Sequence, residues 1–440
     1  MTHREIHEPD PCGRTMHPLG WPGYPYREGS LEHRLPTEVD RGWKGPAGKN
    51  VDGGGFLNPA MAGNRTRSVI MLDHLAKTVF KKIEKIQIID ALGATGIRTR
   101  RWLNETSDEV ARRLYVTTCD QNETAISWAR SNLELDDRKD QVNLIQGDTR
   151  RTLLSQGWHW IDLDPYGSPI PYLDLAMQAT ARRAVMSISA TDTAALSGSS
   201  PNPLKRRYGA RVHMDGLKHD TGLRILLATS AMAAARHDRV IRPLFTIWDS
   251  HHLRVTVMVE RSKGSANLIQ DSIGWRIHSP SEEDVEMSIG CGLLPEHDRG
   301  SRPMHVMLPL SAHPPPSSMA SGPLWTGDMG SIDVMSSLTE AAAEKICSSL
   351  DSELDFPESK RCKDAVKKIS SEGNAIHGSH LIVTDMLPGF LKRGNPPSPQ
   401  KIARSLRDMG YSAEVSRYAE PSLRTDAPWG SVIQAYDKTG

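Results

Sequence analysis

The residues with the clearest chemical potential stand together in the run from 160 to 169. Apolar residues alternate there with Asp162 and Asp164, which is typical of a strand. Pro165 then ends the strand, because proline has no amide proton for a sheet ladder. Tyr166 follows at once, so a carboxylate and an aromatic ring are adjacent. Such a pair could stack on a flat base while it accepts a proton from an exocyclic amine. The run therefore predicts methylation of an amino group on a nucleobase.

The two aspartates need not share one role. Asp162 precedes Asp164 by two residues on the same face of the strand, about 6–7 Å away by strand rise. We expect Asp162 to be structural or to tune Asp164. The alternative for Asp164 is a capping role, but the Pro165-Tyr166-Gly167 sequence that follows favours a ligand site.

A second chemical segment follows the strand expected at residues 86–90, which Asp90 ends. Gly93 and Gly96 lie in the turn before a helix expected near residue 97. Glycines let a ligand pass close to the backbone, and a helix start offers free amide protons. The GxGxxG pattern of dinucleotide sites is absent, so the turn is more similar to the S-adenosylmethionine turn of class I methyltransferases. The alternative is an ordinary strand-to-helix connection.

Two further aspartates end the next strands. Asp120 is placed to accept hydrogen bonds from ribose hydroxyls, or else to cap the following helix. Asp148, with Thr149 beside it, could accept the exocyclic amine of an adenine, or else form a turn. Because the carboxyl ends of parallel strands share one edge of a sheet, these acids and Asp90 predict one cofactor site.

Alternating strands and helices must position these residues. The expected strands are 86–90, 114–120, 142–146, 160–164 and 184–190, with a closing pair at 245–249 and 254–260. The expected helices are 69–83, one from 97, 125–133, 172–180 and 223–235. This order predicts an α/β fold with a mainly parallel sheet, covered on both faces.

The composition shifts near residues 261–265, which we expect to be a linker. After it we expect a loop at 313–318, helices at 338–350, 364–369 and 402–409, and a strand at 380–385. The predicted organisation is an irregular extension over 1–50, a catalytic domain over 51–262 and a smaller α+β domain over 266–440.

Bulk composition narrows the class of protein. With 440 residues, a mean hydropathy of −0.46 and only short apolar runs, the chain predicts a soluble cytoplasmic protein without a membrane segment or signal peptide. The net charge of +1 does not by itself indicate a nucleic-acid partner, but basic clusters such as 205–211 favour one. The alternative for each cluster is a solvated helix face. Five scattered cysteines without a CxxC pair predict free thiols rather than disulfides or zinc.

The chain resembles the tRNA (guanine-26-N2)-dimethyltransferases, and specifically their archaeal type, from about Phe56 to Gln434. The motifs that carry the resemblance are the segments 56–65, 90–98, 162–169, 190–192, 207–209, 251–254, 322–327 and 423–428. Their number and order make a chance match improbable, and several of them lie in the expected second domain.

The resemblance implies a class I, Rossmann-like methyltransferase domain followed by a family-specific domain that binds tRNA. It implies transfer of one or two methyl groups from S-adenosylmethionine to the N2 amine of guanosine 26, with no obligate protein partner. The catalytic positions are Asp164 and Tyr166. The positions expected to bind cofactor are Arg65, Asp90, Gly93, Gly96, Arg98, Asp120, Asp148 and Thr149. The positions expected to bind substrate are Asn64, Pro165, Arg207 and Tyr208.

Three departures from the family pattern stand out. Tyr166 stands where phenylalanine is more usual, which keeps the stacking face and adds a hydroxyl. Thr99 replaces a frequent glycine and could stiffen the turn after Arg98. Of the cysteine pairs that resemble a zinc site in many members, only Cys291-Gly292 remains, so we expect no metal.

Two classes of alternative stay open. An amino methyltransferase could act instead on adenine N6 or on a protein glutamine, because the same corner chemistry serves each target. A protein that binds tRNA without catalysis could keep the fold, although the intact Asp164 corner argues against it.

Overall fold

The computed structural model describes residues 23–39, 57–312, 319–347, 358–419 and 421–439. Phe56 of the first motif and the loop expected at 313–318 lie outside these residues. Within them, no helix has the length and apolar character needed to cross a membrane.

The chain divides into two compact units. The first comprises residues up to 164 with 179–186 and 337–367, and the second comprises 165–178, 187–336 and 368 to the end. The domain boundaries drawn from the sequence stay predictions. The segment expected as a linker contains a short helix, α10 (Lys263–Ala266), whose start is capped by the Ser262 side chain.

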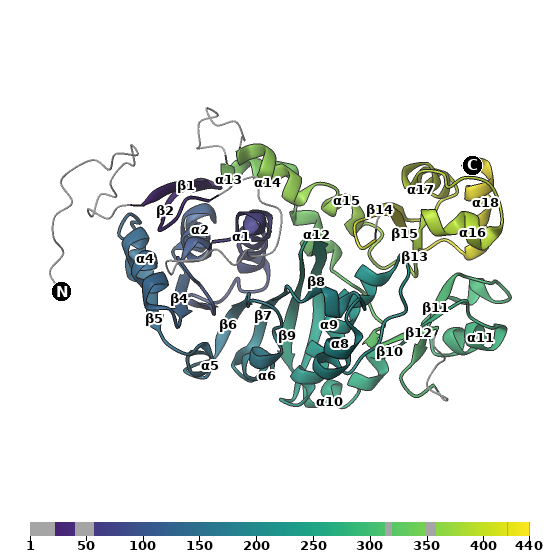
Figure 1. The fold of residues 1–440 in the computed structure, drawn as a ribbon, viewed down its shortest axis with the longest axis horizontal. Helices are drawn as coiled ribbons and strands as arrows, with labels where there is room; N and C mark the ends of the chain where they lie inside the picture. Colours follow the sequence, from purple (N-terminus) through teal and green to yellow (C-terminus); the bar gives the residue numbers. More distant parts are fainter. Residues whose placement is uncertain (1–22, 40–56, 313–318, 348–357, 420, 440) are drawn as a thin grey trace. The chain divides into compact units, whose positions relative to one another are not determined.

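The main sheet has seven strands in the order β5-β4-β3-β6-β7-β9-β8 (Figure 1). The strands are β3 (Ile86–Asp90), β4 (Leu114–Asp120), β5 (Val142–Gln146), β6 (Trp158–Leu163), β7 (Thr180–Ala190), β8 (Arg239–Asp249) and β9 (His252–Arg261). Strands β5, β4, β3 and β6 pair in parallel, whereas β8 and β9 are antiparallel. The predicted α/β class is therefore confirmed, and the bounds expected for β3, β4 and β5 are those observed.

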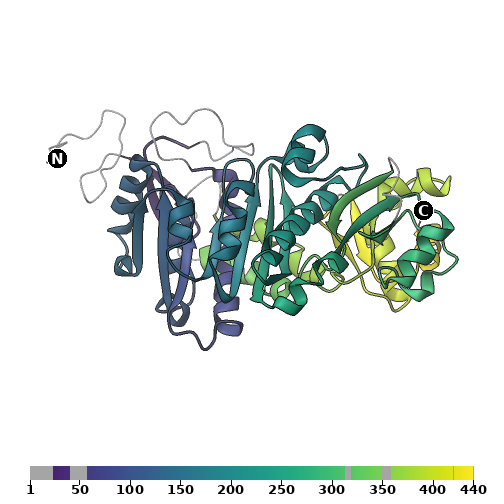
Figure 2. The same cartoon turned by 90° about the horizontal axis from the view of Figure 1, so that it is seen from below.

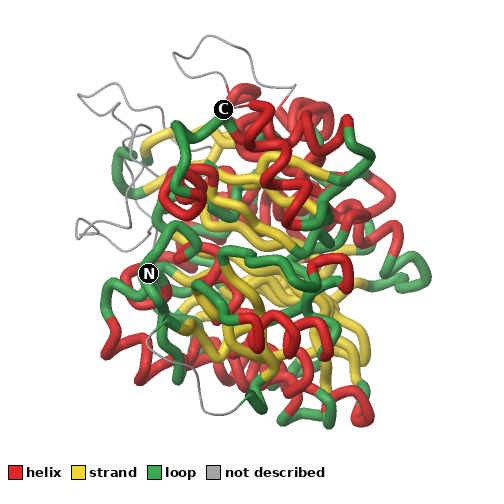
Figure 3. Tube along the Cα trace, turned by 90° about the vertical axis from the view of Figure 1, so that its right-hand side faces the viewer, coloured by secondary structure: helices red, strands yellow, loops and turns green. Residues whose placement is uncertain are grey.

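The parallel register aligns the acids of neighbouring strands. Asp90 pairs with Asp162 across β3 and β6, and with Thr118 across β3 and β4. Both faces of β3 are covered, since Ile88 and Ile89 are fully buried. Figure 2 shows these strands of the first unit side by side. Helices flank the strands in Figure 3, as expected for a parallel sheet.

The helices of the first unit are α1 (Ala62–Thr78), α2 (Ile97–Glu105), α3 (Asp108–Ala111), α4 (Glu123–Leu133), α5 (Thr149–Leu153), α13 (Glu340–Cys347) and α14 (Glu358–Val366). Helix α1 begins at residue 62, well before the expected residue 69. Its first turns bury Asn64, Arg65 and Arg67, and buried polar side chains break the apolar period on which sequence interpretation depends.

A β-hairpin lies where the sequence suggested only an irregular extension. Strands β1 (Tyr24–Glu28) and β2 (Leu31–Leu35) pair antiparallel around Gly29, whose φ of 61° suits glycine. Tyr26 and Leu35 are buried in a cluster with Leu57 and Ile97. The expectation of an irregular chain is therefore wrong for this segment, which belongs to the core of the first unit.

One cysteine pair also corrects the sequence interpretation. Cys347 and Cys362 form a disulfide between α13 and α14, with their Cα atoms 6.9 Å apart. Cys119 and Cys291 are free. The expectation of free thiols is thus wrong for one pair, because no spacing motif reveals which cysteines the fold brings together.

The second unit contains two three-stranded sheets, in the orders β11-β10-β12 and β13-β15-β14. Their strands are β10 (Ile273–His278), β11 (His305–Pro309), β12 (Ala320–Trp325), β13 (His380–Val383), β14 (Ala413–Ser416) and β15 (Ser422–Thr425). The helices of this unit, besides α10, are α6 (Ile170–Gln178), α7 (Thr193–Leu196), α8 (Pro201–Tyr208), α9 (Lys218–Ala235), α11 (Glu282–Gly290), α12 (Ile332–Ser337), α15 (Ile369–Gly373), α16 (Leu387–Leu391), α17 (Pro399–Asp408) and α18 (Trp429–Thr439). This mixture of strands and helices confirms an α+β second region.

Candidate active site

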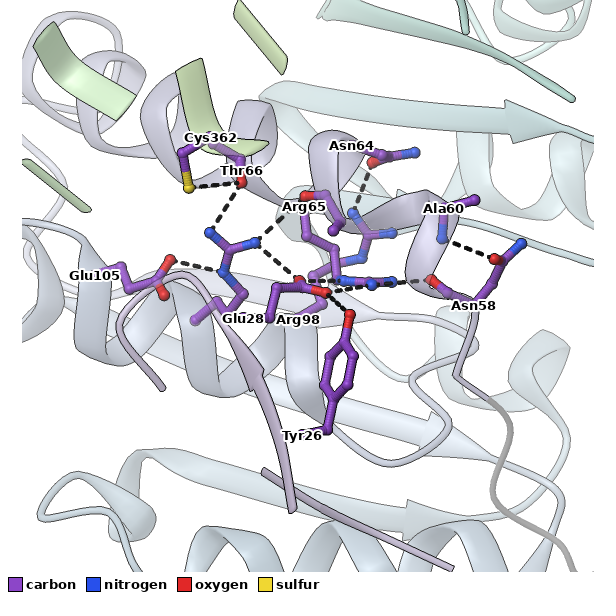
Figure 4. Close-up of polar contacts among 12 residues, drawn as sticks. Tyr26, Glu28, Asn58, Ala60, Asn64, Arg65, Thr66, Arg98, Glu105 and Cys362 are labelled. Carbon is purple, nitrogen blue, oxygen red and sulfur yellow. Dashed lines mark hydrogen bonds and ion pairs between the residues drawn. The ribbon is translucent and has the colours of Figure 1, made fainter. Parts of the chain in front are cut away.

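Arg98, in the first turn of α2, is the centre of the charged cluster in the first unit. Its Nη1 donates to Asn64 Oδ1 at 3.1 Å and lies 3.4 Å from Asp162 Oδ2. Its Nη2 donates to Asp164 Oδ2, and its Nε lies 3.9 Å from Asp90 Oδ1. Figure 4 shows Asn64 facing the Arg98 guanidinium. The Arg98 guanidinium therefore contacts three carboxylates. Asp90 ends β3, Asp162 lies near the end of β6, and Asp164 follows β6.

Three acids of this cluster share the Arg98 guanidinium, and Arg65 also acts electrostatically on Asp164. Burial raises the pKa of Asp90 to about 7; Arg98 opposes that shift, and the nearby Asp162 adds to it. The Asp90 carboxyl therefore resists ionisation beside the other acids.

The turn between β3 and α2 is close-packed. Ala94 and Gly96 have φ of 45° and 77°, and a Cβ at Gly93 would lie 2.3 Å from Thr118 Cγ2. Asp120 Oδ2 accepts a hydrogen bond from Ala94 N at 3.0 Å. No side-chain hydrogen bond caps the start of α2. The turn is held by the Asp120 carboxylate and by close packing against Thr118.

Asp120 does not cap α4, which corrects one of the two interpretations of this residue. The cap is Asn122, whose Oδ1 accepts from Ala125 N at 3.1 Å. Asp120 Oδ1 instead accepts from Asn122 N at 2.9 Å, so this carboxylate braces both the glycine turn and the helix start. Its role toward a ribose stays a prediction.

Asp148 and Thr149 have separate roles at the end of β5. Asp148 caps α5 by accepting from Arg150 N at 2.8 Å, and the hydrogen bonds from Arg150 lower its pKa to about 2. Thr149 is buried and donates its hydroxyl to the Ala91 carbonyl. Thr149 therefore links the end of β5 to the glycine turn, whereas Asp148 is exposed to solvent beside it.

Thr99 anchors the cluster from α2. Its Oγ1 donates to Asp90 Oδ2 at 3.1 Å and lies 2.7 Å from Thr118 Oγ1. The threonine thus fixes the Asp90 carboxyl rather than only occupying the place of a glycine.

Arg65 has a partner that the sequence did not reveal. Its Nε and Nη2 donate to the two carboxylate oxygens of Glu28, each at 2.6 Å, and Nη2 also donates to Asn58 O. Arg101 donates to the same carboxylate at 2.9 Å. Tyr26 Oη also donates to it at 2.8 Å, and Figure 4 shows this contact beside Arg65. The hairpin therefore supplies the counter-charge for α1, and Glu28 is distant in sequence from both Arg65 and Arg101.

The second unit begins at Pro165, inside the 162–169 motif. Tyr166 is 66% exposed to solvent. Gly167 has a φ of 76°, and its N donates to Thr191 Oγ1 at 2.6 Å while its O accepts from Thr191 N at 2.8 Å. This pair of bonds holds the backbone immediately after the tyrosine.

Asp192 joins two residues of the second unit. Its carboxylate accepts from Tyr208 Oη at 2.9 Å and from Arg207 Nη1 at 3.0 Å. Tyr208 Oη also lies 2.9 Å from Ser168 Oγ. Asp192 lies in the 190–192 motif but had no expected role, and the pattern of charges along the chain gave no signal of these contacts.

The structure thus groups the expected site residues into two sets. In the first unit, the guanidinium of Arg98 is contacted by Asn64, Asp90 and Asp164. In the second, Arg207 and Tyr208 meet through Asp192. Pro165 and Tyr166 follow Asp164 in the chain. The ligand roles assigned to all these residues stay predictions.

The fold defines the class of protein first. A solved structure of Trm1 from Pyrococcus horikoshii with S-adenosyl-L-methionine matches with a TM-score of 0.71 at 23% sequence identity. The match covers 94% of this chain and 99% of that chain. The chain therefore has the Rossmann-like methyltransferase fold with the additional C-terminal region.

The family follows from the sequence comparison. Residues 50–437 match the model of the N2,N2-dimethylguanosine tRNA methyltransferase family, and the chain belongs to that family. The chain is thus an S-adenosylmethionine-dependent methyltransferase that acts on tRNA guanine N2, and the resemblance drawn from its sequence is confirmed.

Named relatives agree with this assignment. A tRNA (guanine(26)-N(2))-dimethyltransferase of Aeropyrum pernix is 28% identical over 403 residues, covering 88% of this chain and 89% of the relative. Its counterpart in Thermoplasma acidophilum is 33% identical over 249 residues, covering 57% of this chain and 66% of the relative. In Aquifex aeolicus, a tRNA (guanine(26)-N(2)/guanine(27)-N(2))-dimethyltransferase is 31% identical over half of this chain and 55% of its own length.

Proposed function

We propose that this chain methylates the N2 amine of guanosine 26 in tRNA once or twice, with Asp164 and Tyr166 at the reacting base. The observation that carries the proposal is the ion pair between Asp164 and Arg98 at the end of β6. The side chain of Asp164 is 17% exposed, whereas that of Asp162 is fully buried. Asp164 is therefore the acid of this run that a base could reach.

The chemistry is a direct transfer. When bound, S-adenosylmethionine supplies the methyl group, and its sulfur keeps the electron pair of the broken carbon–sulfur bond. The N2 lone pair forms the new nitrogen–carbon bond, after which the amine releases a proton. Asp164 accepts hydrogen bonds from the amine and then takes this proton, because a carboxylate oxygen in an ion pair retains a second lone pair.

Orientation of the base is the other contribution of the chain. The target guanine must leave its stack before its amine can be reached. Tyr166 provides an exposed ring for it to stack on, and Thr191 holds the next peptide in place. Fixing the amine in line with the methyl group removes much of the entropic barrier.

The proposed cofactor contacts follow the sheet edge. The carboxylates of Asp90 and Asp164 beside Arg98 would favour the sulfonium. Asp120, which ends β4 beside the glycine turn, would bind the ribose, and Asp148 with Thr149 would bind the adenine. Arg65, Gly93 and Gly96 would shape the cavity around them.

The tRNA backbone would lie along exposed cations. Lys205 and Arg206 on α8 are exposed, and Arg207 is partly engaged by Asp192. Such contacts release counterions, so affinity for tRNA should fall as salt rises. A cytoplasmic site of action is part of the same proposal.

The decisive test is Asp164→Asn with labelled cofactor and an unmodified tRNA transcript. We expect at least a 100-fold loss of methyl transfer, about 2.7 kcal/mol in the barrier, with cofactor binding largely retained. Asp174→Asn is the matched control, because Asp174 is exposed on α6. Transfer by Asp164→Asn at the wild-type rate would refute the role of this acid.

Position and number of methyl groups need a second measurement. Mass spectrometry of nuclease fragments should locate the product at guanosine 26, and a transcript with adenosine there should remain unmodified. Product at guanosine 27 in that transcript would instead extend the specificity, as the name of the Aquifex aeolicus relative describes for that enzyme. Mass spectrometry of total nucleosides separates one methyl group from two.

A further inference from the structure

The second unit contains a cavity of about 330 Å³ that includes none of the expected site residues. Five segments wall it: the chain at 213–217 before α9, the end of β10, the start of β11, residue 319 before β12, and residues 385–390 in and before α16. Its lining mixes three histidines and two aspartates with apolar side chains, and its size is at the lower end of ligand-binding cavities.

A chain of polar contacts fixes one side of the cavity. Ser321 Oγ accepts from His213 N at 2.9 Å and lies 3.1 Å from His278 Nε2. His278 Nδ1 in turn lies 2.7 Å from Asp215 Oδ2, and Asp215 Oδ1 accepts from Leu217 N at 2.8 Å. These contacts hold the His278 ring and the Asp215 carboxylate in fixed orientations.

Two imidazoles of this cavity, those of His278 and His305, resist protonation. Burial lowers the pKa of His278 although Asp215 opposes the shift, and burial also holds the pKa of His305 well below its usual value. Both rings are therefore uncharged at neutral pH. Among the described residues that line the cavity there is no lysine or arginine, so a phosphate would find no cation there.

The remaining lining suits a flat, polarisable molecule. The rings of His213 and His278 lie 4.6 Å apart at 42°, next to an apolar surface that includes Met304, Met386 and Phe390. Aromatic rings and methionine sulfur pack well on π-systems. The carboxylate of Asp385, which is exposed at the same cavity, offers an acceptor for ring or amine N–H groups.

We propose that this cavity takes one unstacked nucleobase of the tRNA, different from the guanine that is methylated. The inference rests on the proposed function, because that function brings a tRNA to this chain. Proteins recognise RNA mainly through unpaired bases that stack on side chains and bond through their edges. An occupied cavity would fix the tRNA from the second unit, at a point other than the reacting base.

Gly389 offers a way to fill the cavity without disturbing the fold. It lies in α16 on the cavity wall, and a Cβ built on it meets no atom within 4 Å. Gly430, in α18 of the same unit, is equally open and does not line the cavity. Gly389→Trp therefore blocks the cavity, and Gly430→Trp is the matched control.

The experiment measures tRNA affinity of the full chain by filter binding. We expect Gly389→Trp to weaken affinity for an unmodified transcript on the order of tenfold, as the loss of one stacked base would. Gly430→Trp should bind like the wild type, and both variants should bind S-adenosylmethionine normally. Unchanged affinity in Gly389→Trp would overturn the proposal.

A set of transcripts identifies the base and separates this inference from the proposed function. Each transcript carries one abasic nucleotide at an unpaired position, which removes the base and keeps the phosphate. One such position should weaken binding to the wild type and have no further effect on Gly389→Trp. If every position affects both proteins equally, the cavity takes no base, even though wild-type methylation of guanosine 26 persists. If that methylation is absent, the proposed function fails instead, and the binding data still decide on the cavity.

Discussion

Two charged clusters of this molecule are opposites in composition. In the first unit, one arginine, Arg98, faces the carboxylates of Asp90, Asp162 and Asp164. In the second unit, one aspartate, Asp220, faces three arginines. These are Arg224 at 2.8 Å, Arg276 in direct contact, and Arg424 at 3.6 Å.

In each cluster one member of the majority charge has a pKa shifted toward its neutral form. Burial raises the pKa of Asp90 to about 7, with Arg98 opposing it. Burial lowers the pKa of Arg224 to about 10, with Asp220 opposing it. The physical problem is the same, because burial disfavours an ion that shares its counter-charge with others.

Solvent access gives the two clusters different roles. The side chain of Asp164 is 17% exposed, so solvent and a ligand can reach the first cluster. The side chains of Asp220 and its three arginines are at most 7% exposed, so the second cluster is closed. We infer that the open cluster serves binding and catalysis, and the closed one holds elements together.

The closed cluster also explains motifs of the second region. Asp220 on α9 joins Arg276 on β10 and Arg424 on β15. Arg224 donates to the carbonyls of Trp325 and Gly327, each at 2.9 Å. The 322–327 and 423–428 motifs, which the sequence linked to tRNA binding, therefore converge on a structural ion cluster.

The largest expected effect is on stability, from Asp220→Asn. Removing the Asp220 carboxylate takes away the counter-ion that three buried arginines share, so we expect a loss of about 3–5 kcal/mol. Urea unfolding should detect it, with the exposed Asp174→Asn as the control. A loss below about 1 kcal/mol would mean that the closed cluster does not hold its elements.

The next effect is on activity, from Arg98→Met. We expect kcat/KM to fall at least 100-fold, about 2.7 kcal/mol, because Asp164 loses the group that orients it. The exposed Arg112→Met is the control. If Arg98→Met lowered the free energy of unfolding by as much as it raised the barrier to methyl transfer, the Arg98 cluster would also be a structural one, like that of Asp220.

A smaller effect concerns the pH dependence of stability through Asp90. Its pKa of about 7 in the folded chain lies above the ordinary value of 3.8, so the folded state holds a proton that the unfolded state releases. This contribution to stability is present below about pH 4 and is lost as pH rises through 7. Asp90→Asn should flatten the fall of Tm between pH 5 and 8 relative to the wild type.

The control for this comparison is Asp108→Asn, since the Asp108 side chain is 75% exposed. It should keep the wild-type pH profile. If the slope of Tm against pH were unchanged in Asp90→Asn, Arg98 would offset the effect of burial on the pKa of Asp90.

The smallest effect is expected from Tyr166→Phe. The exposed ring keeps its stacking face, so kcat/KM should change by less than about threefold, under 1 kcal/mol. Tyr166→Ala removes the face and should lower kcat/KM on the order of tenfold. A large effect of Tyr166→Phe in steady-state kinetics would assign the hydroxyl a role of its own.

Much of the fold was predictable because its strands are encoded by short local patterns in the sequence. The bounds of β3, β4 and β5 agree with the sequence, since each is a short run rich in apolar and β-branched residues that ends at polar or turn-forming ones. The same runs placed Asp90, Asp120 and Asp148 at strand ends. The family motifs then added the target chemistry.

The missed elements share a cause, which is the burial of polar residues. Helix α1 begins early because Arg65 and Arg67 lie inside, and the hairpin was hidden because Glu28 and His33 are buried. A buried ion interrupts the apolar period, and its partner lies far along the chain.

The sequence by itself determined which residues could do chemistry, the α/β order of the main sheet and the family of the chain. The tertiary structure alone decided the partners: Glu28 for Arg65, Arg98 for Asp164, and Cys347 for Cys362. Strands and turns arise from interactions between near neighbours, which leave a pattern in the sequence. Ion pairs and disulfides join residues that only the folded chain brings within a few ångströms.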